Sequence, residues 1–345
     1  MRSPARVTLA NLPTPLVRAP RLSEAIGIEV LLKRDDLTGL ALGGNKARSV
    51  EFHVGAAEEA GADVLVTGGG PRSSWVLTAA VGAAARGLAV ELVMFGDRPP
   101  PGRGSLELLD RLDGVKVTFT GDRVRSSVDP MLVTLEEQLR SSGHHPYVVG
   151  RGGADAVGAF GYLSAVDELE GQLGDRGVVP RTLWLSTGSC GTQAGLLAGY
   201  RRSPGGTLIV GASVHRPVDE CEERIRTISE AALDLAGVEE RYEVSWELLD
   251  ERDADPGEVE TAAAVMARTE GILLDPEFGS PALAALMREA SQVEGPVVFL
   301  VTGGTLNLFY GSSAASAVPQ EVGLSGRSGS FQAGRRHAGS EHRVS

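Results

Sequence analysis

The sequence has few cysteines, few aromatic residues and no long apolar run. Cys190 and Cys221 are its two cysteines, so we expect no disulfide framework and a reducing compartment. Aromatic residues make up only 5%, which argues against an aromatic-rich binding surface. No apolar run reaches the roughly 20 residues of a membrane span. The N-terminus, interrupted by Pro4, Pro13 and Pro15, lacks the apolar segment of a secretory signal. We therefore expect a cytoplasmic protein.

Basic charge is also scarce. The chain has 45 acidic and 33 basic residues and a net charge of −12. This balance argues against nucleic acid or an anionic membrane as the main partner. With 345 residues, of which 42% are apolar, the chain can bury a large core and is expected to form two domains. Its 45 glycines indicate many tight turns of the α/β type.

Apolar stretches with the length of buried strands alternate with helical stretches from residue 28 onward. The predicted strands are 28–32, 64–67, 90–95, 115–118, 147–149, 182–186, 207–212 and 297–301. The predicted helices are 47–60, 74–86, 105–112, 130–141, 156–173, 192–200, 218–236, 259–269 and 281–290. This alternation predicts parallel sheets covered by helices on both faces. Residues 323–345 have no periodic apolar positions, so we expect a disordered tail there.

A lysine near the N-terminus lies in a setting that suits covalent chemistry. The string KRDD (33–36) follows an apolar run, and GGNK (43–46) then places Lys46 at the start of a predicted helix. A lysine held beside backbone amides and away from bulk water can lose its proton. The neutral amine can then form a Schiff base with an aldehyde. The alternative is a surface lysine after a loop. We expect Asp35 and Asp36 to brace this loop rather than act as catalytic carboxylates.

Three glycine-rich turns each follow a predicted strand and open a helix. They are GGGPRSS (68–74), STGSCGT (186–192) and TGGT (302–305). Free N–H groups and the helix dipole favour anions at such turns. None has the Gly-Lys-Ser/Thr of a Walker loop or the spaced glycines of a dinucleotide site. We expect the turns to converge on one phosphorylated ligand. The second is the best phosphate cradle because Ser189 and Thr192 add hydroxyl groups.

These motifs carry a family resemblance. In order, the chain contains KRDD, GGNKAR, GGGPRSS, STGSCGTQAGLLAG, GASVHR, LLDPEFGSPALA and VVFLVTGGT. From about Leu12 to Phe309 it resembles the pyridoxal-phosphate (PLP) enzymes related to ACC deaminase and D-cysteine desulfhydrase. These enzymes have the tryptophan synthase β-like fold, fold type II. The resemblance implies a two-domain, three-layer α/β/α architecture, with a larger PLP-binding domain (1–47 plus 156–322) and a smaller domain (48–155). It also implies the cofactor pyridoxal 5′-phosphate, bound between the domains, and a homodimer.

The resemblance also assigns roles to residues. Lys46 would carry the cofactor and act as the catalytic base, and Ser73 would be a second catalytic residue. The residues expected to bind the cofactor are Lys46, Asn45, Ser74, Gly188, Ser189, Cys190, Gly191, Thr192 and Thr302. The residues expected to bind the substrate are Arg72, Ser73, Trp75 and Phe278. No metal site is expected, since the adjacent His144 and His145 have no further ligands near them in the sequence.

The chain departs from the family pattern around the first and second turns. Arg72-Ser73-Ser74 stands where the family has Gln-Ser-Asn. Arg72 brings a fixed cation, which suits an extra carboxylate, sulfonate or phosphate on the substrate. The alternative is that Arg72 turns outward or pairs with a nearby acid. Cys190 replaces a glycine. Its backbone amide can still bind phosphate, and a nucleophilic role for its thiol is disfavoured.

The segment DPEFGSP (275–281), which precedes the last predicted strand, stands where the family has Asp-Pro-Val-Tyr-(Glu/Thr)-Gly-Lys. Phe278 replaces a tyrosine, so the ring is kept and the hydroxyl is lost. The next residue, which faces the pyridine nitrogen in the relatives, is Gly279, so Thr302 or Ser280 is expected to donate there. A neutral partner leaves a weaker electron sink, which suits elimination better than chemistry with a long-lived carbanion.

We therefore predict a PLP-dependent lyase or deaminase that acts on a small amino acid. It would remove the α-proton and then eliminate or replace a β-substituent, with a specificity different from that of its relatives, in secondary metabolism. Two alternatives stay open: an amino-acid racemase or epimerase, and a PLP-binding protein without turnover. His215 is kept as an acid at the rim of the site, whereas His53 and Cys221 are interpreted as packing residues.

Overall fold

A computed structural model describes residues 2–100, 105–205 and 207–309. The predicted tail, 323–345, lies outside these residues. The strands are β1 (Leu16–Arg18), β2 (Val30–Lys33), β3 (Val64–Gly69), β4 (Ala89–Met94), β5 (Val115–Phe119), β6 (Pro146–Val148), β7 (Thr182–Thr187), β8 (Leu208–Ser213), β9 (Trp246–Asp250) and β10 (Val297–Leu300). The helices are α1 (Pro20–Ile26), α2 (Lys46–Glu59), α3 (Ser74–Ala84), α4 (Ser105–Leu109), α5 (Val128–Ser141), α6 (Ala156–Gly174), α7 (Gly191–Tyr200), α8 (Val218–Ala236), α9 (Pro256–Glu270) and α10 (Gly279–Glu289).

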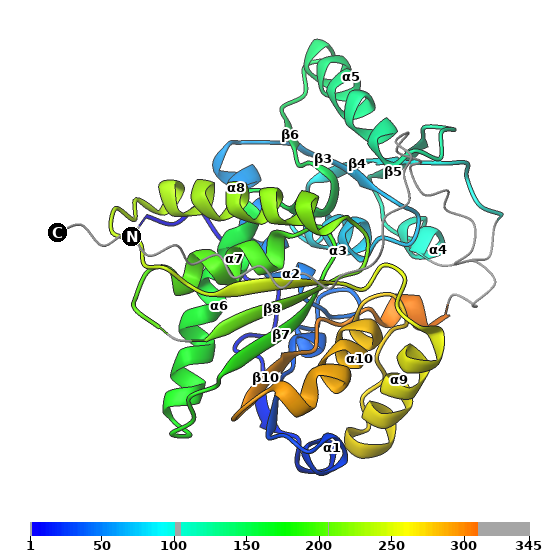
Figure 1. The fold of residues 1–345 in the computed structure, drawn as a ribbon. Coiled ribbons are helices and arrows are strands. Elements are labelled where there is room, and N and C mark those ends of the chain that lie inside the picture. Colours follow the sequence, from blue (N-terminus) through cyan, green and yellow to red (C-terminus); the bar gives the residue numbers. More distant parts are fainter. Residues whose placement is uncertain (1, 101–104, 206, 310–345) are drawn as a thin grey trace, which may run out of the picture.

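The strands form two separate sheets. The larger sheet has the order β1-β2-β10-β7-β8-β9, and the smaller has the order β5-β4-β3-β6. All neighbouring strands are parallel except β1, which is antiparallel to β2. Because β10 pairs with β2, and Val297 lies opposite Val30, the N-terminal segment belongs to the sheet built by the second half of the chain. Figure 1 shows α6, α7 and α8 on one face of the larger sheet and α1, α9 and α10 on the other.

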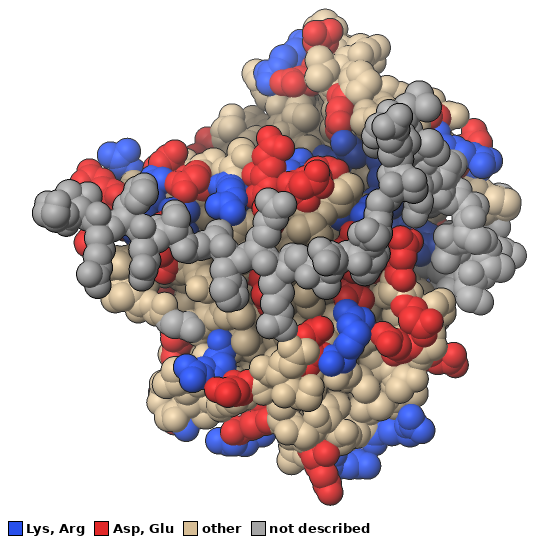
Figure 2. All heavy atoms as spheres, viewed as in Figure 1, with Lys and Arg blue, Asp and Glu red and all other residues tan. Residues whose placement is uncertain are grey.

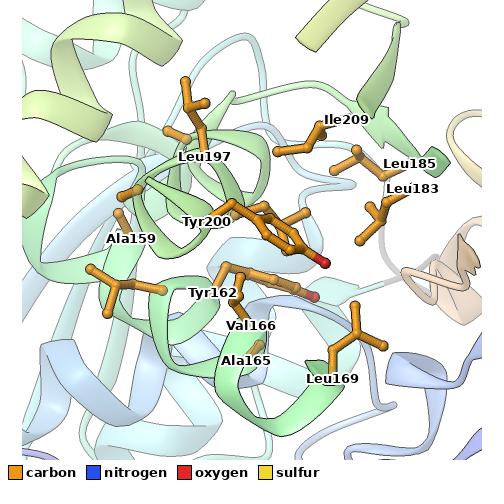
Figure 3. Close-up of a cluster of buried hydrophobic side chains, with 14 of the residues drawn as sticks. Ala159, Tyr162, Ala165, Val166, Leu169, Leu183, Leu185, Leu197, Tyr200 and Ile209 are labelled. Carbon is orange, nitrogen blue, oxygen red and sulfur yellow. The ribbon is translucent and has the colours of Figure 1, made fainter. Parts of the chain in front are cut away.

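The largest core lies between α6, α7 and the strands β7 and β8. Its side chains include Ala159, Tyr162, Ala165, Val166, Leu169, Leu183, Leu185, Leu197, Tyr200 and Ile209 (Figure 3). The two helices approach closely at Gly195, where a Cβ atom would lie 2.4 Å from the carbonyl oxygen of Ala159. On the opposite face, Trp184, Phe299 and Leu283 belong to a second buried cluster. The strands β2, β10 and β7 are therefore buried along their whole length because both of their faces are covered.

The predicted parallel sheets with helices on both faces are confirmed. Each predicted strand and helix is present, with bounds that differ by a few residues. The sequence did not indicate β1, α1 or β9. β1 has three residues, α1 has seven, and β9 is an edge strand whose side chains are all exposed or half-buried. Such elements carry no continuous apolar run for a pattern to detect.

The division into two domains stays a prediction. The smaller sheet, from β3 to β6, lies within the range 48–155 that was assigned to the smaller domain. The larger sheet draws its strands from the two flanking ranges. Within the described residues, no helix is both long and apolar enough to cross a membrane.

Candidate active site

A cleft of about 1070 Å³ lies where the carboxyl ends of strands from both sheets meet. Its walls come from the turns after β3, β7, β8, β9 and β10, together with the start of α2. In open α/β sheets, the carboxyl ends of the strands are the usual place for a ligand. Every predicted site residue except Gly191 lines this cleft. The fold thus brings together three glycine-rich turns and a lysine that lie far apart in the sequence.

Lys46 is the first residue of α2 and is half-buried in the cleft wall. Gly43 and Gly44 have φ values of +76° and +112°, and the tight turn they make leads directly into the helix. The backbone N–H of Asn45 donates to the carbonyl of Thr302 over 2.9 Å, which ties this turn to the one after β10. Burial lowers the pKa of Lys46 to about 8, while the Cys190 thiol acts in the opposite direction. A much larger fraction of this amine is neutral near pH 7 than for an exposed lysine.

The loop before Lys46 is braced by buried ion pairs. Asp35 accepts hydrogen bonds from Arg48 Nε over 2.7 Å and Thr14 Oγ1 over 2.6 Å. Burial alone would raise the pKa of Asp35, but the Arg48 guanidinium and these hydrogen bonds hold it below the ordinary value. Asp36 pairs with Arg34 over 2.7 Å. Both carboxylates brace the loop, as expected, and neither lines the cleft.

The loop of residues 188–192 has the form of an anion cradle at the start of α7. The first turn of a helix leaves its N–H groups without partners inside the helix, so they are available to an anion. Thr192 Oγ1 accepts a hydrogen bond from Asn45 Nδ2 over 2.9 Å, which joins the cradle to the lysine turn. Cys190 has a φ of +75°, a left-handed conformation that favours glycine. Its thiol is hydrogen-bonded to the free thiol of Cys221 and is buried, and both effects raise its pKa, so it is not a reactive thiolate.

The cleft also holds a charged cluster that the sequence did not reveal. Arg72 Nη2 lies 2.5 Å from Glu277 Oε2, and His215 Nε2 lies 3.2 Å from Glu277 Oε1. Burial would raise the pKa of Glu277, but His215 and Arg72 lower it to about 2. Arg72 thus pairs with a nearby acid, which is one of the two alternatives open from the sequence. The ring of Phe278 meets that of His215 edge-on, with centroids 5.0 Å apart.

The side chains of Ser73 and Trp75, which follow Arg72, make hydrogen bonds within the smaller sheet and α3. Ser73 is the N-cap of α3, and its Oγ accepts the N–H of Val76 over 3.5 Å. Trp75 is only 1% exposed and donates from Nε1 to Thr67 Oγ1 over 2.9 Å. Trp75 lines the cleft but presents little surface to it. The predicted catalytic role of Ser73 and the predicted substrate contact of Trp75 stay predictions.

Sequence reasoning also missed several basic residues of the cleft: Arg125, Arg151, Arg216 and Arg252. Arg216 Nη1 donates to the carbonyl of Gly188 over 2.9 Å and so steadies the cradle. Arg151 pairs with Asp129 over 2.7 Å. Figure 2 shows basic surface within the recess between the part that carries α5 and the part that carries α9. No linear motif could have revealed this group because its members come from four separate loops.

The residues of the cleft fit PLP. This cofactor offers an aldehyde, a phosphate and a pyridine nitrogen. The cleft supplies an amine with a lowered pKa on Lys46, free N–H groups and hydroxyls in the cradle, and the hydroxyl of Thr302, which lies 3.2 Å from Ser186 Oγ. Ser280 also lines the cleft, but its Oγ donates to the carbonyl of Leu274 over 3.3 Å. The donor set thus matches the chemical groups of the cofactor.

Comparisons with known proteins agree with this donor set. The family model "Pyridoxal-phosphate dependent enzyme" matches residues 7–303. A putative 1-aminocyclopropane-1-carboxylate deaminase of Pyrococcus abyssi (strain GE5 / Orsay) is 33% identical over 313 residues, which cover 88% of this chain and 93% of that protein. A D-cysteine desulfhydrase of Klebsiella pneumoniae subsp. pneumoniae is 33% identical over 318 residues, which cover 88% and 95%.

Solved structures give the same result for the fold. The crystal structure of an ACC deaminase homologue matches with a TM-score of 0.81 and 31% identity, covering 89% of this chain and 94% of that one. A threonine deaminase of T.th. matches with a TM-score of 0.60 and 21% identity, covering 85% and 92%, and this likeness concerns the fold alone. The predicted fold type II architecture and the predicted cofactor are confirmed, and the chain belongs to the pyridoxal-phosphate dependent enzymes.

Proposed function

We propose that this enzyme is a lyase or deaminase that removes the α-proton of a small amino acid and then eliminates or replaces its β-substituent. The observation that carries the proposal is Lys46, whose pKa burial lowers to about 8, in a cleft that also contains the anion cradle. The names of the relatives, a deaminase and a desulfhydrase, support the same reaction class. We also propose a homodimer, a cytoplasmic location and the two domains described above.

Different residues of the chain would hold the cofactor, position it and move the proton. When bound, PLP supplies an electron sink for the α-carbon of the substrate. The cradle from Gly188 to Thr192 would hold the phosphate, and Asn45 would fix the position of the cradle relative to Lys46. Lys46 Nζ would accept the α-proton, because an amine with a pKa of about 8 can take up and release a proton near neutral pH. The cleft walls would keep bulk water from the substrate.

We propose that the substrate differs from those named for the two relatives. The charged cluster of Arg72, Glu277 and His215 lines the cleft beside Phe278. The resemblance gave glutamine, valine and tyrosine at positions 72, 277 and 278. A wall with an ion pair and without a phenol hydroxyl presents different partners to a substrate side chain.

The first experiment is a visible absorption spectrum of the purified protein with PLP. We expect a yellow band that borohydride removes and that Lys46→Ala lacks. Lys116→Ala is the matched control, because the Lys116 side chain is 77% exposed and pairs with Glu91 away from the cleft. A band that persists in Lys46→Ala would refute the assignment of Lys46.

The second experiment separates the reaction classes. Each enantiomer of a set of small amino acids is incubated with the loaded enzyme. Release of ammonia together with a 2-oxo acid supports the proposed elimination. Loss of chirality alone would show a racemase instead, and binding without either product would show a protein that holds PLP without turnover.

A further inference from the structure

We propose that His215 is a further catalytic residue, which gives a proton to the leaving β-substituent. This role rests on the proposed elimination. His215 follows β8, and its side chain is 19% exposed and lines the cleft. A Cβ atom on Gly188 would lie 3.0 Å from Phe278 Cε1 and 3.3 Å from His215 Cδ2. The rings of His215 and Phe278 therefore both lie against Gly188, at the start of the cradle, so a substrate held beside the cradle would meet the imidazole.

Glu277 orients this ring. Its Oε1 lies 3.2 Å from Nε2 of His215, and its Oε2 lies 2.5 Å from Arg72. Within the described part of the chain, Nδ1 of His215 makes no hydrogen bond. A carboxylate that holds one ring nitrogen and leaves the other free is the arrangement found in general acids and bases. Nδ1 is therefore the nitrogen available to the substrate.

The other titratable groups of the cleft are poor proton donors for this step. The arginines do not release a proton at ordinary pH. Glu277 stays ionised, and Cys190 is part of the cradle. Glu251 is buried in an ion pair with Arg288, and Glu260 is exposed on α9. Lys46 is assigned to accept the α-proton, so it is not the donor in this step. Among the described residues, this leaves His215.

The α-proton passes to Lys46 Nζ. The bond between Cβ and the leaving atom breaks, both of its electrons go to that atom, and the electron pair left by the α-proton forms a double bond between Cα and Cβ. The proton on His215 Nδ1 joins the same atom, and the imidazolium becomes a neutral imidazole that later recovers a proton from water. Glu277 keeps its negative charge throughout and stays beside Nε2 of the ring.

A series of leaving groups tests this role. The substrates are β-chloroalanine, cysteine and serine, in both enantiomers, and the readout is kcat and KM for 2-oxo acid release. Chloride leaves without a proton, whereas hydroxide needs one. We expect His215→Gln to lower kcat about 100-fold or more for serine, less for cysteine, and by less than about threefold for β-chloroalanine. His144→Gln is the control, because His144 is exposed and pairs with Asp63 outside the cleft.

Several outcomes would overturn the role. An equal loss for all three substrates, or an unchanged rate with serine, would show that His215 does not protonate the leaving group. If the wild-type enzyme eliminates only chloride, which leaves without a proton, His215 does not protonate the leaving group. If the wild-type enzyme exchanges the α-proton but releases no 2-oxo acid from any substrate, the proposed function itself fails, and this role fails with it.

Two further measurements address the placement of the ring. Phe278→Tyr in the His215→Gln background should restore part of the serine activity, because a phenol can donate from the same wall; no restoration would count against this placement.

Carbethoxylation of the holoenzyme, read by peptide mapping, should modify His215, and bound alanine should slow this reaction but not that of His144. If bound alanine does not slow the carbethoxylation of His215, the ring does not face the substrate.

Discussion

Lys46 owes its altered proton affinity to burial rather than to a neighbouring cation. Its amine lies in the cleft wall, where loss of solvent disfavours the charged form and lowers its pKa to about 8. An exposed lysine titrates about two units higher. The difference would allow Lys46 to act as the proposed nucleophile and base near neutral pH.

This pKa predicts how the rate of cofactor uptake depends on pH. Only the neutral amine attacks an aldehyde, so the rate at which cofactor-free protein takes up PLP should rise with pH through about 8 and then level off. Stopped-flow absorbance at a series of pH values measures this rate. A rise centred near 10 would mean that Lys46 is solvated like an ordinary lysine.

The left-handed backbone of Cys190 predicts which of its glycine and alanine variants is the more stable. Its φ of +75° strains any residue with a Cβ, by roughly 1–2 kcal/mol. Cys190→Ala keeps this strain and also loses the buried thiol, whereas Cys190→Gly removes the strain. We therefore expect the glycine variant to be at least as stable as the alanine variant in urea unfolding. The reverse order would show that the loop is not left-handed at this residue.

At the scale of elements, one polar cluster joins β2, α2 and α6. Glu168 of α6 accepts from Arg48 of α2 over 2.8 and 2.9 Å and pairs with Lys33 of β2. Burial would raise the pKa of Glu168, but Arg48 and Lys33 lower it to about 2. A carboxylate with a lowered pKa stabilises the fold above its ordinary pKa and loses this contribution as pH falls through the folded value.

Glu168 therefore predicts part of the acid sensitivity. The free energy of unfolding of the wild type should fall as pH drops from 4.5 towards 2, and Glu168→Gln should flatten that decline. At pH 7 the variant should lose about 1–3 kcal/mol, because charged hydrogen bonds are removed. Glu136→Gln breaks only an exposed pair and serves as control. Equal acid profiles for the wild type and Glu168→Gln would exclude this coupling.

The turn after β10 fits closely against the loop before α10. Gly304 has a φ of +104°, and a Cβ atom there would lie 2.3 Å from Oδ2 of the buried Asp275. Asp275 in turn accepts from the N–H groups of Glu277, Phe278 and Gly279 over 2.8 to 3.0 Å. The position of the charged wall thus depends on the absence of a side chain at residue 304.

Gly304→Ala should disturb both stability and cofactor binding. Gly143→Ala is the matched control, because Gly143 has a φ of +87° but no atom within 4 Å of its Cβ position. The control should lose about 1 kcal/mol from backbone strain alone, and Gly304→Ala should lose distinctly more. Urea unfolding and PLP titration measure the two effects. Equal losses would mean that Asp275 moves aside at no cost.

At the scale of the whole molecule, the ion pair of Arg72 and Glu277 spans the cleft. Arg72 follows the smaller sheet, and Glu277 lies between α9 and α10, which cover the larger sheet. Because both side chains are partly exposed, the pair is worth about 1 kcal/mol or less. It joins the two halves that must move if the cleft opens to admit substrate.

Removal of this pair should therefore loosen the two loops locally. In Arg72→Gln, amide exchange at residues 70–74 and 276–278 should become a few times faster, while the strands keep their protection. Hydrogen exchange followed by mass spectrometry resolves these segments. Arg86→Gln breaks an exposed pair with Glu58 elsewhere and should leave both loops unchanged. Unaltered exchange in Arg72→Gln would show that the pair does not hold the cleft closed.

The sequence by itself determined the features that depend on neighbours along the chain. Apolar runs of strand length, glycine at the strand ends and the GGNK turn are local patterns, and they were enough to predict the parallel sheets, the cradle and Lys46. Short peripheral elements such as β1 and β9 bury few side chains, so they left no such pattern.

Only the tertiary structure decided which groups meet across the cleft. Arg72 and Glu277 are 205 residues apart, and they meet because parallel strands from two sheets present their carboxyl ends to one space. The same arrangement places His215 beside Glu277 and brings four arginines from separate loops to the cleft. A contact between distant segments depends on strand order and register, and neither property is encoded in the residues that flank each partner.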